Sequence, residues 1–173
     1  MKISSGSNLV QVEDFGKMRI KNTSRYPTAE VERLVRFAAK GIGKSRVEIH
    51  VKNSRQVFAG RAWHIIGNNR IVNVAKYVDD LVVVRIGPPA KFPIEFSYPR
   101  LKTVPRYTIR DWKEAIVSVT AHELYHIKQR RACRRASEVK AERWALKRLE
   151  AYRKQPNQDL GNSTVRKSLF LSD

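Results

Sequence analysis

The sequence HELYH, at residues 122–126, places two imidazoles and one carboxylate at a fixed helical spacing. His122 and His126 are four residues apart, so on an α-helix both rings project from one face and can reach a single metal ion. Glu123 is rotated from His122 by about 100°, which places its carboxylate beside the metal rather than on it. The motif therefore predicts a catalytic site with one zinc ion per chain, at which Glu123 is the general base.

A pair of histidines one turn apart is also compatible with a purely structural role. The residues upstream favour the metal, because an apolar stripe at positions i, i+3, i+4 and i+7 runs down the same helix: Trp112, Ala115, Ile116 and Val119. The stripe continues to His122 and His126. We therefore expect both histidines on a buried face, where an unsatisfied imidazole costs free energy and a metal ion would satisfy it.

A catalytic zinc ion usually takes a third protein ligand and leaves its fourth position for water. Glu138 is the preferred candidate, because it begins a helical stripe that turns toward the interior: Glu138, Ala141, Glu142, Ala145, Leu149 and Tyr152. Glu142, one turn further on, is expected to accept the remaining ring N–H of a ligand histidine and so to fix its tautomer. Alternatively, both glutamates form salt bridges with the abundant arginines.

At this point the residues resemble a known family. The HELYH motif, followed after a short link by a helix with Glu138 and Glu142, is similar to the gluzincin metallopeptidases, and most of all to the compact minigluzincins and ImmA-type peptidases. The resemblance implies that Glu138 is the third zinc ligand. Those families more often carry aspartate or asparagine at the position of Glu142. Residues 59–78, AGRAWHIIGNNRIVNVAKYV, resemble the SprT-like proteases, but this chain has no histidine after His126 to serve as their third ligand.

The order of predicted elements indicates an α+β fold. We expect a helix over 27–40, strands over 46–52, 57–66, 70–75 and 81–86, and an edge strand near 17–20. An N-terminal helix, a small mixed or antiparallel sheet, the motif helix and the glutamate helix together predict a zincin-like single domain. Its boundaries are placed at 27–154, between an N-terminal extension, 1–26, and a polar C-terminal tail, 155–173.

Residues 87–107 contain five of the seven prolines and are too long for a plain connection. They are expected either to border the active site, with Phe92, Phe96 and Tyr98 available to a substrate, or to form a stiff surface loop whose aromatic residues cover the core. By the resemblance to zincins, an extended substrate pairs with a strand edge within 81–86. Because that strand is so apolar, it is alternatively a central one.

Composition excludes several classes of protein. The chain has 173 residues, of which 42% are hydrophobic, enough for one substantial core. No apolar run approaches the roughly 20 residues of a membrane span, and no secretory signal is evident, so we expect an intracellular protein without membrane contact. The single cysteine excludes an intrachain disulfide.

The net charge of +19, from 35 basic and 16 acidic residues, favours anionic partners. The densest basic block, residues 128–135, lies between the motif histidines and Glu138, and its cations are Lys128, Arg130, Arg131, Arg134 and Arg135. The block predicts non-specific binding of nucleic acid through phosphates. An acidic protein partner and a merely solvated surface are the alternatives.

Two functions follow. The leading one is a zinc metalloendopeptidase of the gluzincin type that acts on a protein or peptide, with His122, His126 and Glu138 as ligands and Glu123 as base. The alternative is a basic nucleic-acid-binding protein on a zincin scaffold, with structural or vestigial zinc. Glu123 favours the enzyme, because a structural site needs no base. A protease recruited to DNA would combine the two. Candidates for stabilising the oxyanion are His50, His64, Tyr125 and Tyr152.

Overall fold

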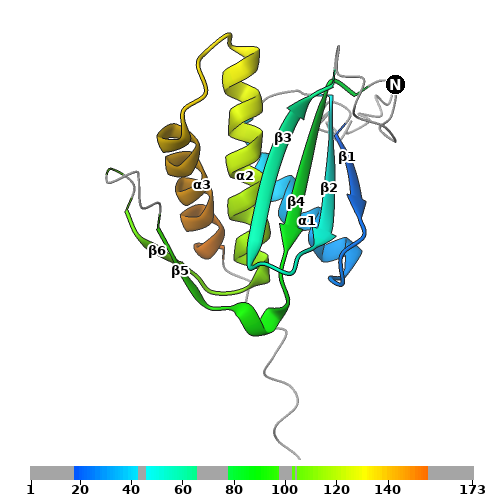
Figure 1. Ribbon diagram of the computed structural model, residues 1–173, viewed down its shortest axis with the longest axis vertical. Coiled ribbons are helices and arrows are strands. Elements are labelled where there is room, and N and C mark those ends of the chain that lie inside the picture. Colours follow the sequence, from blue (N-terminus) through cyan, green and yellow to red (C-terminus); the bar gives the residue numbers. More distant parts are fainter. Residues whose placement is uncertain (1–17, 43–45, 66–77, 98–102, 104, 156–173) are drawn as a thin grey trace, which may run out of the picture.

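The computed structural model describes residues 18–42, 46–65, 78–97, 103 and 105–155. This part of the chain forms an α+β domain with three α-helices, a four-stranded mixed sheet and a two-stranded sheet (Figure 1). The elements in chain order are β1 (Arg19–Asn22), α1 (Thr28–Ala39), β2 (Val47–Asn53), β3 (Phe58–His64), β4 (Asp80–Ile86), a 3₁₀ turn (Pro89–Lys91), β5 (Ile94–Phe96), β6 (Tyr107–Ile109), α2 (Trp112–Arg131) and α3 (Glu138–Arg153).

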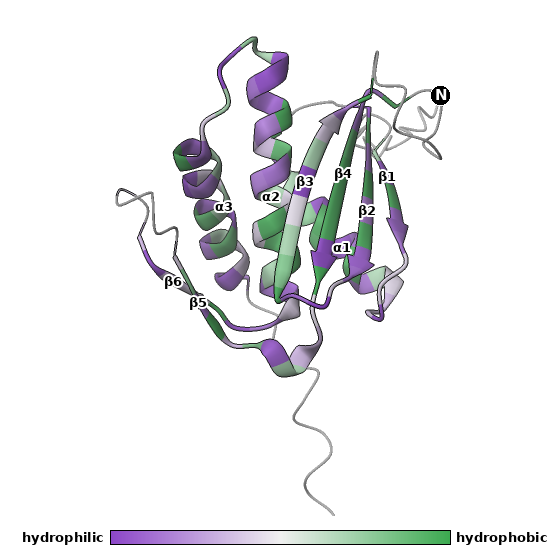
Figure 2. Ribbon diagram, viewed as in Figure 1, coloured by the Kyte–Doolittle hydropathy of each residue, from purple (hydrophilic) through white to green (hydrophobic). Residues whose placement is uncertain are grey.

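The larger sheet has the strand order β1-β2-β4-β3. β1 is parallel to β2, β2 is parallel to β4, and β3 is antiparallel to β4. β4 therefore lies inside the sheet, a position that is compatible with its largely apolar sequence (Figure 2). The prediction that residues 81–86 offer a pairing edge to a substrate is wrong, and the alternative of a central strand is confirmed. Within the described residues, the edge beside α2 belongs to β3.

The core lies between the sheet and the helices. One face of the sheet packs against α1 and α2, and α2 lies between the sheet and α3 (Figure 1). Val82 and Val84 of β4 and Leu34 of α1 are fully buried there. Because α2 has neighbours on several sides, its middle section, residues 114–124, is buried all round rather than along a single stripe. The motif histidines are therefore on the most enclosed helix described.

Local interactions fix the ends of α2 and α3. The Asp111 side chain accepts a hydrogen bond from the Glu114 backbone N–H at 2.9 Å and caps α2. Cys133, with a φ of 50°, turns the chain out of α2, and Ser137 caps α3. At the far end, Arg153 of α3 pairs with Glu114 of α2 at 2.6 Å. The two helices are thus held antiparallel along their length.

Several strand predictions are confirmed and others are changed by the structure. The segments 46–52 and 57–66 correspond to β2 and β3, and the predicted 27–40 helix is α1. The edge strand begins two residues later than expected, and since it pairs with β2, this part of the 1–26 segment belongs to the sheet. The predicted strand over 70–75 lies outside the described residues. No helix among the described residues is long and apolar enough to cross a membrane.

The proline-rich segment is partly ordered as a second sheet, which the expectation of a loop missed. β5 pairs antiparallel with β6, and Phe96 faces Tyr107 across the pair. Phe92 and Phe96 are half-buried and pack against the core, which agrees with the second of the two interpretations of this segment. Tyr98 lies outside the described residues. The β5-β6 pair matters for the site because it brings Tyr107 beside α3.

Candidate metal centre

Three candidate ligands converge between α2 and α3. His122 Nε2 and His126 Nε2 lie 3.0 Å apart on consecutive turns of α2. Glu138, the first residue of α3, places Oε2 3.2 Å from His122 Nε2 and Oε1 3.4 Å from His126 Nε2. His122 is buried and His126 half-buried, whereas the Glu138 side chain is 53% exposed. The cluster is therefore open on the side of Glu138.

These separations fit a zinc ion. Ligand atoms about 2.1 Å from a tetrahedral zinc lie about 3.4 Å from each other. The two imidazole nitrogens lie 3.0 Å apart, one Glu138 oxygen lies 3.2 Å from His122 Nε2, and the other Glu138 oxygen lies 3.4 Å from His126 Nε2. Two imidazole nitrogens and one carboxylate oxygen are also a common donor set for catalytic zinc. His122, His126 and Glu138 are thus placed where they could hold a metal ion together.

His122 is oriented by a chain of hydrogen bonds. Its Nδ1 lies 2.9 Å from Glu142 Oε2, inside the interface of α2 with α3. Because a carboxylate only accepts, Nδ1 carries a proton, and the neutral ring would present its Nε2 lone pair to His126 and Glu138. Glu142 Oε1 in turn accepts a hydrogen bond from the Tyr107 hydroxyl of β6. A lone pair directed at a second carboxylate is unfavourable unless a cation lies between them.

Tyr107 was not predicted as part of the site. It lies 35 residues before Glu142 in the sequence and reaches it only because β6 runs beside α3. Its hydroxyl also lies 3.4 Å from Ser118 Oγ of α2. The half-buried ring contacts Phe96, which contacts Phe58 of β3. A tyrosine two residues after a proline and close to the start of the motif helix gave no signal for this role in the sequence.

The charges around the two imidazoles favour a cation. Burial lowers the pKa of His122, but the hydrogen bond with Glu142 and the charges of the nearby glutamates outweigh burial, so the pKa is raised above its usual value. Burial and the charge of His122 lower the pKa of His126. His122 is therefore the more readily protonated of the two imidazoles.

Glu123 is buried between α2 and the edge strand β3. Its carboxylate accepts a hydrogen bond from the Ala62 backbone N–H. A Cβ on Gly60 would lie 2.5 Å from Glu123 Oε1, so only glycine allows β3 to approach this closely. Burial raises the pKa of Glu123, opposed by the charge of His122. Glu123 thus lies beside the cluster, held by the sheet, and is not one of the three converging ligands.

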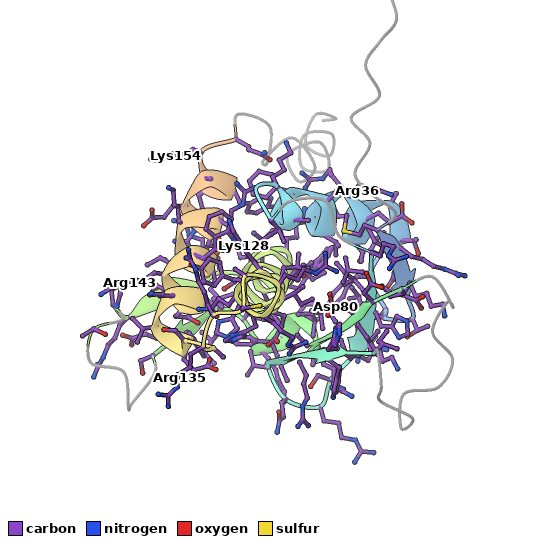
Figure 3. All side chains as sticks on the ribbon, turned by 90° about the horizontal axis from the view of Figure 1, so that it is seen from above. Arg36, Asp80, Lys128, Arg135, Arg143 and Lys154 are labelled. Atoms are coloured by element: carbon purple, nitrogen blue, oxygen red, sulfur yellow. The ribbon has the colours of Figure 1, made fainter. Side chains whose placement is uncertain are left out.

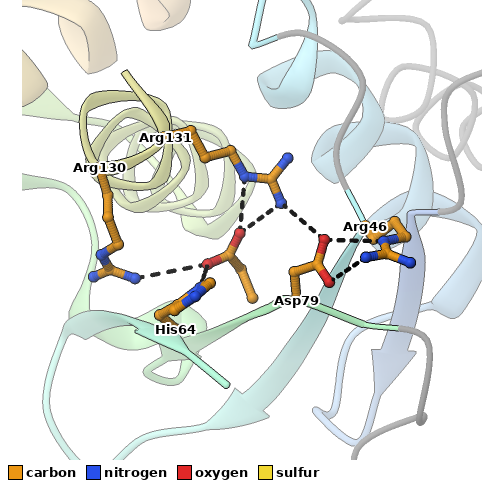
Figure 4. A network of polar contacts seen from close by, with 6 residues as sticks. Arg46, His64, Asp79, Arg130 and Arg131 are labelled. Carbon is orange, nitrogen blue, oxygen red and sulfur yellow. Dashed lines mark hydrogen bonds and ion pairs between the residues drawn. The ribbon is translucent and has the colours of Figure 1, made fainter. Parts of the chain in front are cut away.

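The basic block at 128–135 is divided by the fold. Arg131 binds Asp80 at 2.6 Å and approaches Asp79 at 3.9 Å, and Arg130 lies 3.6 Å from Asp80, which is almost fully buried at the start of β4 (Figure 4). His64 also contacts Asp80, at 3.0 Å. These arginines therefore link the end of α2 to the sheet.

The rest of the block has a different environment. Lys128 donates to the Gly41 carbonyl and lies over the Trp144 ring. Arg134 and Arg135 are exposed in the turn between α2 and α3. The sequence predicted that all five cations of this block bind a polyanion. Arg130 and Arg131 instead form ion pairs with Asp79 and Asp80, which local spacing could not reveal.

The candidates for an oxyanion stabiliser are dispersed. His50 contacts Glu48 on β2, and His64 contacts Asp80. Tyr125 stacks on Trp144, and Tyr152 packs against Phe37. No family model, curated protein or solved structure matches this chain. Its function is therefore inferred from the chemistry of the cluster.

Proposed function

We propose that the protein is a zinc-dependent metallopeptidase of the gluzincin type, which hydrolyses peptide bonds in a protein or peptide substrate. The observation that carries the proposal is the convergence of three donor atoms within 4.8 Å of one another next to a buried carboxylate that is not one of them. This is the combination that a metal-assisted hydrolysis requires: a cation site and a separate base.

His122, His126 and Glu138 would hold the zinc ion. When bound, zinc acts as a Lewis acid that polarises a carbonyl and lowers the pKa of water. Glu142 keeps His122 in the tautomer that presents Nε2, and the Tyr107 hydroxyl holds Glu142 in place.

Glu123 is assigned the proton transfers. Its carboxylate takes a proton from the attacking water and then delivers that proton to the leaving amine. The hydrogen bond from Ala62 and the close approach of Gly60 limit the positions that the carboxylate can take. Such restriction favours catalysis, because the base does not have to be ordered during the reaction.

β3 is the strand that we assign to the substrate. Within the described residues it pairs with β4 only, so its outer edge offers main-chain donors and acceptors, apart from the Ala62 N–H, which already donates to Glu123. It also touches the base through Gly60. An extended peptide that adds to this edge would be carried past Glu123, with affinity supplied by backbone hydrogen bonds. This assignment replaces the strand at 81–86.

A structural or vestigial zinc is supported less well. Structural zinc sites are closed by four protein ligands, whereas the cluster found in the described residues has three, and Glu138 leaves it half-exposed. A structural site would also gain nothing from burying Glu123 next to its ligands, since burial of a carboxylate costs free energy.

The proposal is tested with Glu123→Gln, compared with Glu150→Gln on the exposed side of α3 as the matched control. Zinc per chain is measured by elemental analysis, and hydrolysis is followed with casein and a fluorogenic peptide library. We expect Glu123→Gln to retain one zinc and lose at least about 100-fold in activity, and Glu150→Gln to behave as the wild type. A zinc-free wild type, or unchanged activity in Glu123→Gln, would contradict the proposal.

A further inference from the structure

One face of the four-stranded sheet is not covered by any described helix. α1 and α2 pack on the opposite face, where Val82 and Val84 belong to the core (Figures 1 and 3). Side chains alternate along a strand, so Leu81 and Val83 point away from that core. Both are buried, yet neither belongs to the core cluster. The sheet therefore has a second face, turned away from α2 and its metal ligands.

Basic residues are concentrated on this second face. The strand register places five cations in line with Leu81, Val83 and Arg85: Arg19, Lys21, Lys52, Arg61 and Arg85 itself. All but Lys21 are exposed, and nitrogen-tipped side chains project from the sheet on the side away from the helices (Figure 3). The cations come from all four strands and so extend across the full width of the sheet.

The only carboxylate that the register places on this face is already engaged. Glu48 is fully buried, and its Oε1 lies 2.9 Å from Lys21 Nζ and 2.5 Å from His50 Nε2. With five cations and one carboxylate on the described strands, the face is positive by four charges. A positive potential of this kind attracts an anionic partner.

The same face carries one aromatic residue. Trp63 is in register with Leu81, and the Arg61 guanidinium lies over its ring, 5.5 Å from the centroid. An indole beside a guanidinium plane is a surface on which a nucleobase stacks.

We propose that this face of the sheet binds single-stranded nucleic acid, with the backbone phosphates on the cations and a base stacked on Trp63. The surface is distinct from the 128–135 block, in which Arg130 and Arg131 are directed to Asp79 and Asp80. None of its residues is a proposed zinc ligand or base, although Arg61 and Trp63 belong to β3, the strand assigned to the substrate, and the Arg61 charge acts on Glu123. Contacts to phosphates predict weak sequence preference.

The test measures fluorescence anisotropy of a labelled 20-nucleotide oligo(dT) and oligo(rU) against the full-length protein over a range of salt concentrations. The face variant combines Arg19→Glu, Lys52→Glu and Arg85→Glu. The matched control has the same change of charge on exposed helix positions, Arg36→Glu, Lys140→Glu and Lys147→Glu. Circular dichroism and zinc content verify that both variants fold.

We expect the face variant to bind at least about tenfold more weakly than the control, and the slope of log K against log salt to fall by about 2, near 0.7 for each lost phosphate contact. Trp63→Leu should lose about 5- to 150-fold, the usual range for one stacked base. Equal losses in the face and control variants, or no binding by the wild type at low salt, would overturn the proposal.

An acidic polypeptide provides the competing explanation. If poly-glutamate binds the wild type as tightly as the oligonucleotides at the same salt concentration, and Trp63→Leu leaves both affinities unchanged, the surface serves an acidic protein and the proposal fails. If Arg134→Glu with Arg135→Glu alone abolishes oligonucleotide binding, the turn between α2 and α3 is the site instead.

Discussion

Gly60→Ala should damage both stability and catalysis, because one methyl group enters the contact of β3 with α2. The new Cβ would lie 2.5 Å from Glu123 Oε1, 2.7 Å from Glu123 Cγ and 2.7 Å from Val119 Cγ1. Favourable contacts between carbon atoms begin at about 3.5 Å, so the strand has to move by nearly 1 Å or Glu123 has to leave its place. Overpacking of this kind costs about 1–3 kcal/mol.

The assay combines thermal unfolding, zinc analysis and peptidase activity. For a chain of this size the cost corresponds to about 2–12 °C in Tm, and a displacement of about 1 Å at a catalytic group costs on the order of 100-fold in rate. Zinc should stay bound, since no ligand lies on β3. Ala59→Ser, a change on the other face of the same strand, is the control. Wild-type activity and Tm in Gly60→Ala would refute the assignment of β3 as the strand that positions the base.

Three further outcomes follow. Tyr107→Phe should lower zinc affinity by up to about tenfold, the lower end of the range for groups that orient a ligand, as measured by competition with a chelator; unchanged affinity would show that Glu142 needs no support. Arg131→Ala should destabilise the fold by about 1–3 kcal/mol in chemical denaturation, because Asp80 stays buried with fewer partners; a smaller loss would mean that Arg130 replaces it. Chelation of zinc should lower Tm by about 5–11 °C if zinc is present at about 100 times its Kd, and wild-type Tm after chelation would exclude a ligand that binds the native state.

The fold was predictable where sequence periodicity reflects one environment. The α1 and α2 helices and strands β2 to β4 follow from apolar spacing and turn residues. The position of β4 inside the sheet does not follow from its sequence, because a continuous apolar strand indicates only that both of its faces are buried. The β5-β6 pair was missed because prolines dominate its segment and each strand has only three residues.

The candidate site divides in the same way. The convergence of His122, His126 and Glu138 was predictable, because these residues lie on two consecutive helices and are separated by helical spacing and one short turn. Tyr107 and Gly60 could not be assigned to the site, since they reach it through contacts across the fold. The ion pairs of Arg130 and Arg131 depend in the same way on where β4 begins.

The proposed metal ligands lie close together in the sequence, whereas Glu123 and the strand residues that hold it lie far apart, and this difference affects the order in which their contacts form. The proposed ligands span residues 122–138, and the entropy cost of closing so short a loop is small. The hairpin of α2 and α3 can thus assemble its donor atoms early, whereas the contacts of Glu123 with Gly60 and Ala62 need the sheet to dock. The proposed metal ligands and the proposed base therefore depend on different parts of the fold: the ligands need only the α2–α3 hairpin, whereas the position of Glu123 needs the sheet as well.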